Sequence, residues 1–297
     1  MASTIGWELY RTFLSVMEEG SLSGAARALG LTQPTVGRQV SNLEKALGLH
    51  LFTRSQSGLL PTEAARALLG DAAAMRSTAS ALERTARSFG EGIRGAVRVS
   101  ASEVVGVEVL PPILARLQQR HPDLQIELVL SNEVQDLVRR EVDIAVRMTT
   151  PTQDVLLATR VGDVLLGLHA HPAYLLRQGQ PETLTELERH RLIGFDRETP
   201  FIRGARRQLG SWTRDKFSWR SDSDLAQLAL IRAGAGIGVC QLGLAAREPR
   251  LVRVLPDVFS FKLTTWVAMH EALRDSPRCK VVFDGLVAGF REYVQER

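Results

Sequence analysis

Apolar residues recur at helical spacing through residues 7–19, and a second short helical stretch, GAARALG, follows at residues 24–30. A third helix is expected to begin after Thr32, whose hydroxyl can cap it. Its apolar face carries Val36, Val40, Leu43 and Leu47. The opposite face is polar and basic. Two short helices joined by a tight turn, the second with a polar exposed face, predict a helix-turn-helix.

The segment that follows Gly48, LHLFTRSQSGLLPT, has two short apolar runs around the polar turn SQSG. This arrangement predicts a β-hairpin, which would serve as the wing of a winged helix-turn-helix. The same apolar pattern also fits a small helical bundle with a solvated polar face. The spacing alone leaves both interpretations open.

A long helix is expected over residues 62–89, which lack proline after Pro61. Apolar side chains recur there with spacings of three and four over more than three heptads, which is typical of a helix that pairs with another helix. The seam consists of Ala65, Leu68, Ala72, Met75, Ala79, Leu82, Ala86 and Phe89. It predicts a homodimer, with packing against the chain's own domain as the alternative.

The pattern changes after the glycines at 90, 92 and 95 to alternating strands and helices, which predicts an α/β region with parallel strands and right-handed crossovers. The first set contains the strands VRVSA, IELVL, DIAVR and VLLGLHA and the helices PILARLQQR and EVQDLVRR. The second set contains LIGF, SDLAQLALIRAG and IGVCQ, followed by the strand KLTTWVAMH and a terminal helix over residues 276–296. Two such sets predict a bilobed binding module.

The composition narrows the class of protein. The 297 residues are 44% apolar and 24% charged, and this length suggests two domains. Two cysteines exclude a disulfide framework and favour a reducing compartment. The N-terminus does not resemble a signal peptide, and no apolar run reaches the ~20 residues of a membrane span, so we expect a cytoplasmic protein. The net charge of +4 leans only weakly toward anionic partners.

The string GSLSGAARALGLTQPTVGRQVSNLEKALGLHLFTR resembles the winged helix-turn-helix of LysR-type transcriptional regulators. Residues 95–114 and 223–241 resemble the effector-binding domain of the same family, which is a bilobed, periplasmic-binding-protein-like α/β module. The resemblance implies a DNA-binding domain over residues 1–62, a dimerising linker helix and hinge over 63–92, and an effector domain over 93–297. It also implies double-stranded operator DNA, a small effector such as an aromatic metabolite, a homodimer or homotetramer, and RNA polymerase as partners.

The expected DNA-contacting residues lie at the start of the third helix and in the wing, where such proteins meet base edges and phosphates. They are Thr32, Gln33, Pro34, Thr35, Arg38 and Arg54. Gly37 departs from the family pattern, since relatives carry Ser or Thr there. Thr32 replaces the usual Ser.

The expected effector residues follow strand ends, because ligands of α/β sheets bind beyond the carboxyl ends of strands. They are Ser100, Ser102, Arg147, Thr149, Phe195 and Arg197. Ser102 matches a family pocket position. Val104 stands where many relatives have a hydroxyl, so we expect a less polar contact there.

The other residue groups that could suggest a cofactor, metal or redox site are expected to have structural roles. The glycines at 234, 236 and 238 follow a helix and precede a strand, the reverse of a dinucleotide loop. His169 and His171 lack nearby ligands with metal spacing, and Cys240 lies in an apolar strand. We expect no cofactor and no catalytic site. The leading interpretation is a DNA-binding regulator that senses a small molecule; the alternatives are a bilobed solute-binding protein and an enzyme with a DNA-binding appendage.

Overall fold

The fold is described from a computed structural model of the chain. It describes residues 5–55, 58–87, 93–132, 142–148, 150–151, 155–198, 203 and 212–295. The chain divides after Arg87 into two units, and each has its own core.

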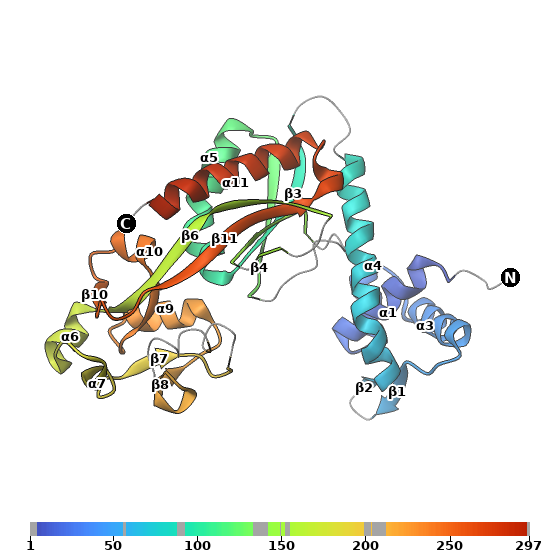
Figure 1. The fold of residues 1–297 in the computed structure, drawn as a ribbon. Coiled ribbons are helices and arrows are strands. Elements are labelled where there is room, and N and C mark those ends of the chain that lie inside the picture. The colour runs from blue at the N-terminus through green and yellow to red at the C-terminus, as the bar shows by residue number, and fades with distance from the viewer. Residues whose placement is uncertain are drawn as a thin grey trace. The chain divides into compact units, whose positions relative to one another are not determined.

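The first unit contains three short helices, a hairpin and one long helix (Figure 1). These are α1 (Trp7–Glu19), α2 (Leu22–Leu29), α3 (Gln33–Leu47), β1 (Phe52–Ser55), β2 (Gly58–Pro61) and α4 (Glu63–Arg87). The three short helices end at Gly20, Gly30 and Gly48, each with φ near +66°, which glycine adopts without strain. The strands β1 and β2 pair antiparallel. The predicted helix-turn-helix and the predicted wing hairpin are therefore confirmed.

The core of this unit forms where the helices turn their apolar faces inward. Phe13 of α1 and Leu43 of α3 are fully buried in one cluster, and Val36 and Val40 of α3 lie in a second cluster with α2. Leu47 is only half-buried. The buried side of α3 is thus the side that the sequence pattern indicated.

The long helix α4 corrects part of the predicted dimer seam. Ala65 and Ala72 are buried in the same cluster as Phe13 and Leu43, and Leu68 packs against that cluster. These side chains are covered by their own domain, so they are not available to a partner helix. The alternative of packing on the chain's own domain holds for this half of α4. Phe89 lies outside the described residues.

The second unit is built around a seven-stranded sheet with the order β10-β6-β11-β5-β3-β4, and β9 also pairs with β6. The strands are β3 (Gly95–Ala101), β4 (Leu124–Leu130), β5 (Ile144–Arg147), β6 (Leu156–Ala170), β9 (Gly238–Gln241), β10 (Val252–Val254) and β11 (Phe261–His270). Helices α5 (Leu110–Arg120) and α11 (Pro277–Gln295) lie side by side and pack on the sheet (Figure 1). A π-helical turn, η1 (Val105–Val109), leads into α5.

The prediction of parallel strands holds for only part of this sheet. β3 is parallel to β4 and to β5, but β11 runs antiparallel to β5 and β6, and β9 and β10 run antiparallel to β6. The chain leaves the part of the sheet formed by β3, β4 and β5 along the fifteen-residue strand β6, and it returns to that part along β11. Two strands that carry the chain out and back must be antiparallel, and they need no crossover helix.

The elements between β6 and β11 form a second lobe with its own apolar cluster around Tyr174, Phe217 and Phe259. Its further elements are α6 (Pro172–Gln178), α7 (Leu184–Leu187), β7 (Leu192–Gly194), η2 (Arg214–Lys216), β8 (Phe217–Arg220), α9 (Asp224–Arg232) and α10 (Leu242–Ala246). We call β3, β4, β5, η1, α5 and α11 the first lobe, and the elements from α6 to β10 the second lobe. The second predicted helix of the first set, residues 133–140, lies outside the described residues.

Candidate functional site

The start of α3 presents a polar surface. Thr32, Gln33, Pro34 and Arg38 are exposed, and Thr35 is half-buried. The hydroxyl of Thr32 accepts a hydrogen bond from the backbone N–H of Thr35 and shares a 2.8 Å contact with the Thr35 hydroxyl. The helix N-terminus is therefore capped as the sequence indicated, and five of the six expected DNA-contacting residues lie together on it.

Two side chains that the sequence analysis did not single out fix the position of α3. Gln39 accepts a 2.6 Å hydrogen bond from the hydroxyl of Thr12 on α1. Glu44 accepts hydrogen bonds from the backbone N–H groups of Leu51 and Phe52, at 2.7 and 3.3 Å, where the wing begins. The exposed end of α3 is thus held against both α1 and the hairpin.

Gly37 and Arg54 are the remaining positions of this surface. A Cβ added at Gly37 would meet only Leu22 Cδ1, at the ordinary contact distance of 3.6 Å. Packing therefore does not require glycine there. The backbone of Arg54 lies in β1 opposite Leu59, and its side chain falls outside the described part of the chain.

The carboxyl half of α4 keeps its large apolar side chains on the surface of this chain. Met75 is 41% exposed and Leu82 is 62% exposed, and Ala79 is half-buried. The middle of α4 is tied to α1 by an ion pair of 2.6 Å between Arg76 and Glu18. An exposed Leu and Met on one helix are the apolar surface available to a second helix.

In the second unit, the expected effector residues Ser100 and Arg147 lie against each other. The guanidinium of Arg147 donates a 2.8 Å hydrogen bond to the hydroxyl of Ser100 and a 3.0 Å bond to the Val146 carbonyl. Ser100 is fully buried, so its hydroxyl positions Arg147 and does not meet solvent. The expected contact of Ser100 with a ligand stays a prediction.

Ser102 lies where the two lobes meet. It is half-buried, and the next residue, Glu103, receives a 2.7 Å hydrogen bond from the hydroxyl of Ser223, the N-cap of α9. The side chain of Asn132 accepts from the backbone N–H of Glu103 at 3.2 Å and also bonds to Asp224. Burial and the nearby charge of Glu103 raise the pKa of Asp224 to about 6.

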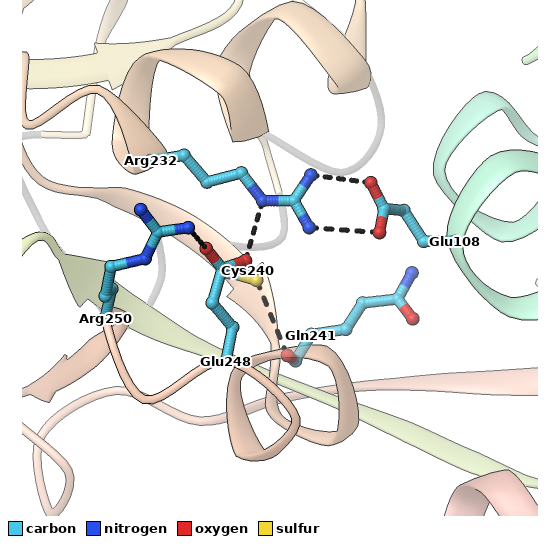
Figure 2. Close-up of polar contacts among 6 residues, drawn as sticks. All are labelled: Glu108, Arg232, Cys240, Gln241, Glu248 and Arg250. Carbon is cyan, nitrogen blue, oxygen red and sulfur yellow. Dashed lines mark hydrogen bonds and ion pairs between the residues drawn. The ribbon is translucent and has the colours of Figure 1, made fainter.

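The opposite end of α9 is tied to the first lobe by a bidentate ion pair. Arg232 donates to the two oxygens of Glu108 at 2.6 and 3.0 Å, and a further 2.8 Å bond reaches Glu248 (Figure 2). Hydrogen bonds from Arg232 lower the pKa of Glu108, and the two carboxylates raise the pKa of Arg232. Because α9 packs on β7 and β9, both of its ends bridge the second lobe to residues 103–108 of the first.

Phe195 and Arg197 follow β7 in the second lobe. Phe195 is half-buried. Arg197 is exposed and lies 3.4 Å from the carboxylate of Asp222, which also accepts the Arg197 backbone N–H at 2.9 Å. Asp222 immediately precedes Ser223, so this segment and the Ser102 segment both approach the start of α9. Thr149 lies outside the described residues.

The residues expected to be structural have structural contacts. His169 is buried with its Nδ1 3.0 Å from the Gly167 carbonyl, and burial lowers its pKa to about 4. His171 caps α6 by accepting from the Ala173 N–H. Burial raises the pKa of the Cys240 thiol to about 12. Gly234 turns with φ +69° between α9 and β9.

Within the described residues, no group of three His, Cys, Asp or Glu side chains is arranged to hold a metal ion. No described helix is both long and apolar enough to cross a bilayer.

Two known protein families together match nearly the whole chain. The family described as the LysR substrate binding domain matches residues 90–291. The family described as the bacterial regulatory helix-turn-helix protein, lysR family, matches residues 7–66.

Individual relatives agree with these matches. An HTH-type transcriptional regulator of Xanthomonas campestris pv. campestris is 30% identical over 183 residues, which cover 62% of this chain and 53% of that protein. The regulator PtxR of Pseudomonas aeruginosa is 30% identical over 251 residues, 82% of this chain and 80% of PtxR. The chain spans only 53% to 61% of the length of the curated relatives that it first matches.

Among solved structures, that of CbnR, a LysR family transcriptional regulator, superposes with a TM-score of 0.70 at 22% identity. The match covers 97% of this chain and 99% of CbnR. At this identity the likeness establishes a shared fold.

Proposed function

Because the chain belongs to the LysR family of bacterial helix-turn-helix regulatory proteins, we propose that it binds a specific DNA sequence and regulates transcription in response to a small molecule. DNA is bound by α3 and the wing, and the small molecule by the second unit. The chain acts as a regulator and carries no catalytic step of its own.

One observation carries the DNA-binding part of the proposal. Gln33, Thr35 and Arg38 lie on the first turns of α3, away from its buried face of Val36, Val40 and Leu43, and Gln33 and Arg38 are exposed. A helix with this distribution can enter the major groove with its polar residues against base edges. The bonds of Gln39 and Glu44 hold it in a fixed orientation, which favours recognition of one sequence.

The test is footprinting of the purified chain on the DNA upstream of its own gene, followed by binding measurements with variants. Arg38→Ala is expected to weaken binding to the protected site by about 1–3 kcal/mol and to relax preference at one base position. The control is Arg120→Ala, which removes the same charge from an exposed position of the second unit and should retain wild-type affinity. Equal affinities for wild type and Arg38→Ala would contradict the assignment of α3.

The sensing part rests on the contacts of α9. Its two ends bridge the lobes, through Ser223 and Glu103 at one end and Arg232 and Glu108 at the other. A ligand that inserts beside Ser102 and Glu103 changes the first of these contacts. The affinity of this ligand therefore differs between the arrangement of the lobes that has the Ser223–Glu103 contact and an arrangement that lacks it. A regulatory ligand requires such a difference in affinity.

The alternative function, a solute-binding protein without a regulatory role, shares the two-lobed unit. It predicts ligand binding without specific DNA binding. A footprint on the chain's own upstream DNA therefore separates the two functions, and its absence, with ligand binding retained, would favour the alternative.

A further inference from the structure

The side chain of Gln33, at the exposed start of α3, is held by a hydroxyl of the neighbouring helix. The Oγ of Ser23 on α2 donates a 3.1 Å hydrogen bond to the Oε1 of Gln33, ten positions further along the chain. Both residues are exposed. The amide nitrogen of Gln33 has no hydrogen-bond partner in the described part of the chain. The oxygen of the amide therefore faces α2, and its N–H donors remain open to solvent.

The capping of the two helices does not require the hydroxyl of Ser23. The N-cap of α2 is Ser21, whose hydroxyl accepts a backbone N–H at 3.0 Å. At the start of α3, the hydroxyls of Thr32 and Thr35 contact each other at 2.8 Å. Among the described contacts, the hydroxyl of Ser23 serves only the side chain of Gln33.

Apolar contacts between α2 and α3 fix the distance over which this bond forms. Ala25 and Ala26 of α2 are buried in one cluster with Val36 of α3. Leu22, which directly precedes Ser23, packs against the same cluster. The start of α2 is thus a rigid support for an exposed side chain of α3. An unrestrained glutamine side chain has many rotamers, and ordering it on binding costs free energy.

We propose that Ser23 is a positioning residue for DNA recognition, which holds the Gln33 amide with its oxygen toward α2 and its N–H donors toward the DNA. The inference rests on the proposed DNA-binding function and adds the chemistry by which Gln33 selects a base. In the major groove, guanine, adenine and thymine each present an acceptor atom, whereas cytosine presents only its amino donor. An amide that approaches with its N–H donors therefore disfavours cytosine at the contacted position.

The test measures the base preference of the full chain and of variants. The probes are the duplex protected in the footprint upstream of the chain's own gene, and duplexes with every other base pair at each position of one half-site. Gln33→Ala identifies the base pair that Gln33 reads, because replacing that pair no longer changes the affinity of this variant. At this position we expect the wild type to bind cytosine roughly tenfold more weakly than the best base, a typical cost of one mismatched base pair.

The Ser23 variants assign this preference to the hydroxyl. Ser23→Ala should lower the affinity for the best duplex by about twofold to tenfold, because the Gln33 side chain must then be ordered on binding. It should also reduce the discrimination against cytosine, since the freed amide can turn its oxygen to the cytosine amino group. Ser23→Thr keeps a hydroxyl and should restore both values. In the Gln33→Ala background, Ser23→Ala should have no further effect.

Controls separate positioning from a structural or a phosphate-binding role. Ser218→Ala removes an exposed hydroxyl of β8 in the second unit and should bind as wild type does. A duplex without the protected site reports binding to phosphates alone, and Ser23→Ala should retain wild-type affinity for it. Its Tm should be at or above that of the wild type, because alanine favours helix.

The proposal is overturned if Ser23→Ala keeps the wild-type base preference, if it weakens binding to all duplexes equally, or if Ser23→Thr fails to restore the preference. In each of these outcomes the wild type still binds its own site specifically, so the proposed regulatory function stands. If the wild type instead binds every duplex with the same affinity, the proposed function is overturned as well. The two failures are therefore distinguishable.

Discussion

Arg232, the last residue of α9, holds the carboxylate of Glu108 with two hydrogen bonds of 2.6 and 3.0 Å, and the two residues are 124 positions apart in the chain. The pair joins the carboxyl end of α9 to η1 of the first lobe. At the amino end of the same helix, Ser223 donates to Glu103 at 2.7 Å. A single nine-residue helix is thus attached to the first lobe at both ends, by an ion pair at one end and a hydrogen bond at the other.

The ion pair should matter most when only one partner is removed. Arg232→Met leaves Glu108 and Glu248 close together without their shared cation, so we expect the free energy of unfolding to fall by about 1–3 kcal/mol. The double variant Arg232→Met with Glu108→Gln should recover part of this loss. Urea unfolding of the four proteins of this cycle gives the coupling energy directly. A coupling near zero would mean that the pair does not hold the lobes together.

The two ends of α9 should stabilise the fold with opposite dependences on pH, through Asp224 at the amino end and Glu108 beside the carboxyl end. The pKa of Asp224 is raised to about 6 in the folded chain, so the folded state binds its proton more tightly than the unfolded state does. The stabilisation is present below the ordinary Asp pKa and is lost as pH rises toward 6. The pKa of Glu108 is lowered, so its stabilising contribution is present at neutral pH and is lost as pH falls.

Asp224→Asn isolates this effect. The amide carries no charge and can still bond to Asn132, so the variant should be more stable than wild type at pH 7, by up to about 2–3 kcal/mol, and equal to it near pH 4. Chemical unfolding across this pH range measures the difference. Glu182→Gln, at an exposed position of the second lobe, is the matched control and should show no such trend. A constant difference between Asp224→Asn and wild type at all pH values would contradict the assignment.

The elements that the sequence predicted correctly depend on neighbours in the chain. The helix-turn-helix follows from spacing, from the capping hydroxyls of Ser21 and Thr32, and from glycines at the helix ends. The wing follows from one turn between two apolar runs. In each case the deciding interactions span only a few residues.

The features that the sequence analysis predicted wrongly or missed are contacts between residues that lie far apart in the chain. The antiparallel pairing of β6 with β11 joins segments about a hundred residues apart, and the sequence of either strand does not specify its direction. Glu103 and Ser223 are 120 positions apart, and neither stands in a motif. Trp266 stands in no motif either, and only the pairing of β11 with β5 places it opposite Arg147. The division of the chain at residues 62 and 92 and the remaining site assignments stay predictions.

Glu44 should stabilise the start of the wing hairpin. Its carboxylate accepts from two backbone N–H groups, those of Leu51 and Phe52, at the entry to the hairpin. Glu44→Ala leaves both donors without this acceptor and should lower the free energy of unfolding by about 1–2 kcal/mol. Hydrogen exchange at residues 51 and 52 should increase. Glu63→Ala, an exposed glutamate at the start of α4, is the control. Unchanged exchange in Glu44→Ala would show that the hairpin is fixed by packing alone.

Gly37 should accept a side chain at a gain in stability. The glycine lies inside α3, a Cβ there meets only Leu22 Cδ1 at 3.6 Å, and its φ is not in the left-handed region. Gly37→Ala is therefore expected to raise the free energy of unfolding by about 0.5–1 kcal/mol, since alanine restricts the unfolded chain and favours helix. Gly30→Ala is the matched control, because φ of +66° makes any side chain there unfavourable. Thermal unfolding should move in opposite directions for the two variants.

The carboxyl half of α4 should mediate self-association. Ala65 and Ala72 are buried within their own domain, so a partner helix can meet only the exposed part of the seam, where Leu82 is 62% exposed. Leu82→Asp places a charge in that contact and should dissociate the dimer, because an unpaired charge is strongly disfavoured in an apolar interface. Leu176→Asp makes the same change at an 88% exposed position of α6 and should leave the assembly intact. Light scattering that shows equal masses for the two variants would exclude this half of α4 as the dimer contact. If Leu82→Asp alone is monomeric, its affinity for a two-fold DNA site should fall as well, because each domain then binds a half-site without the other.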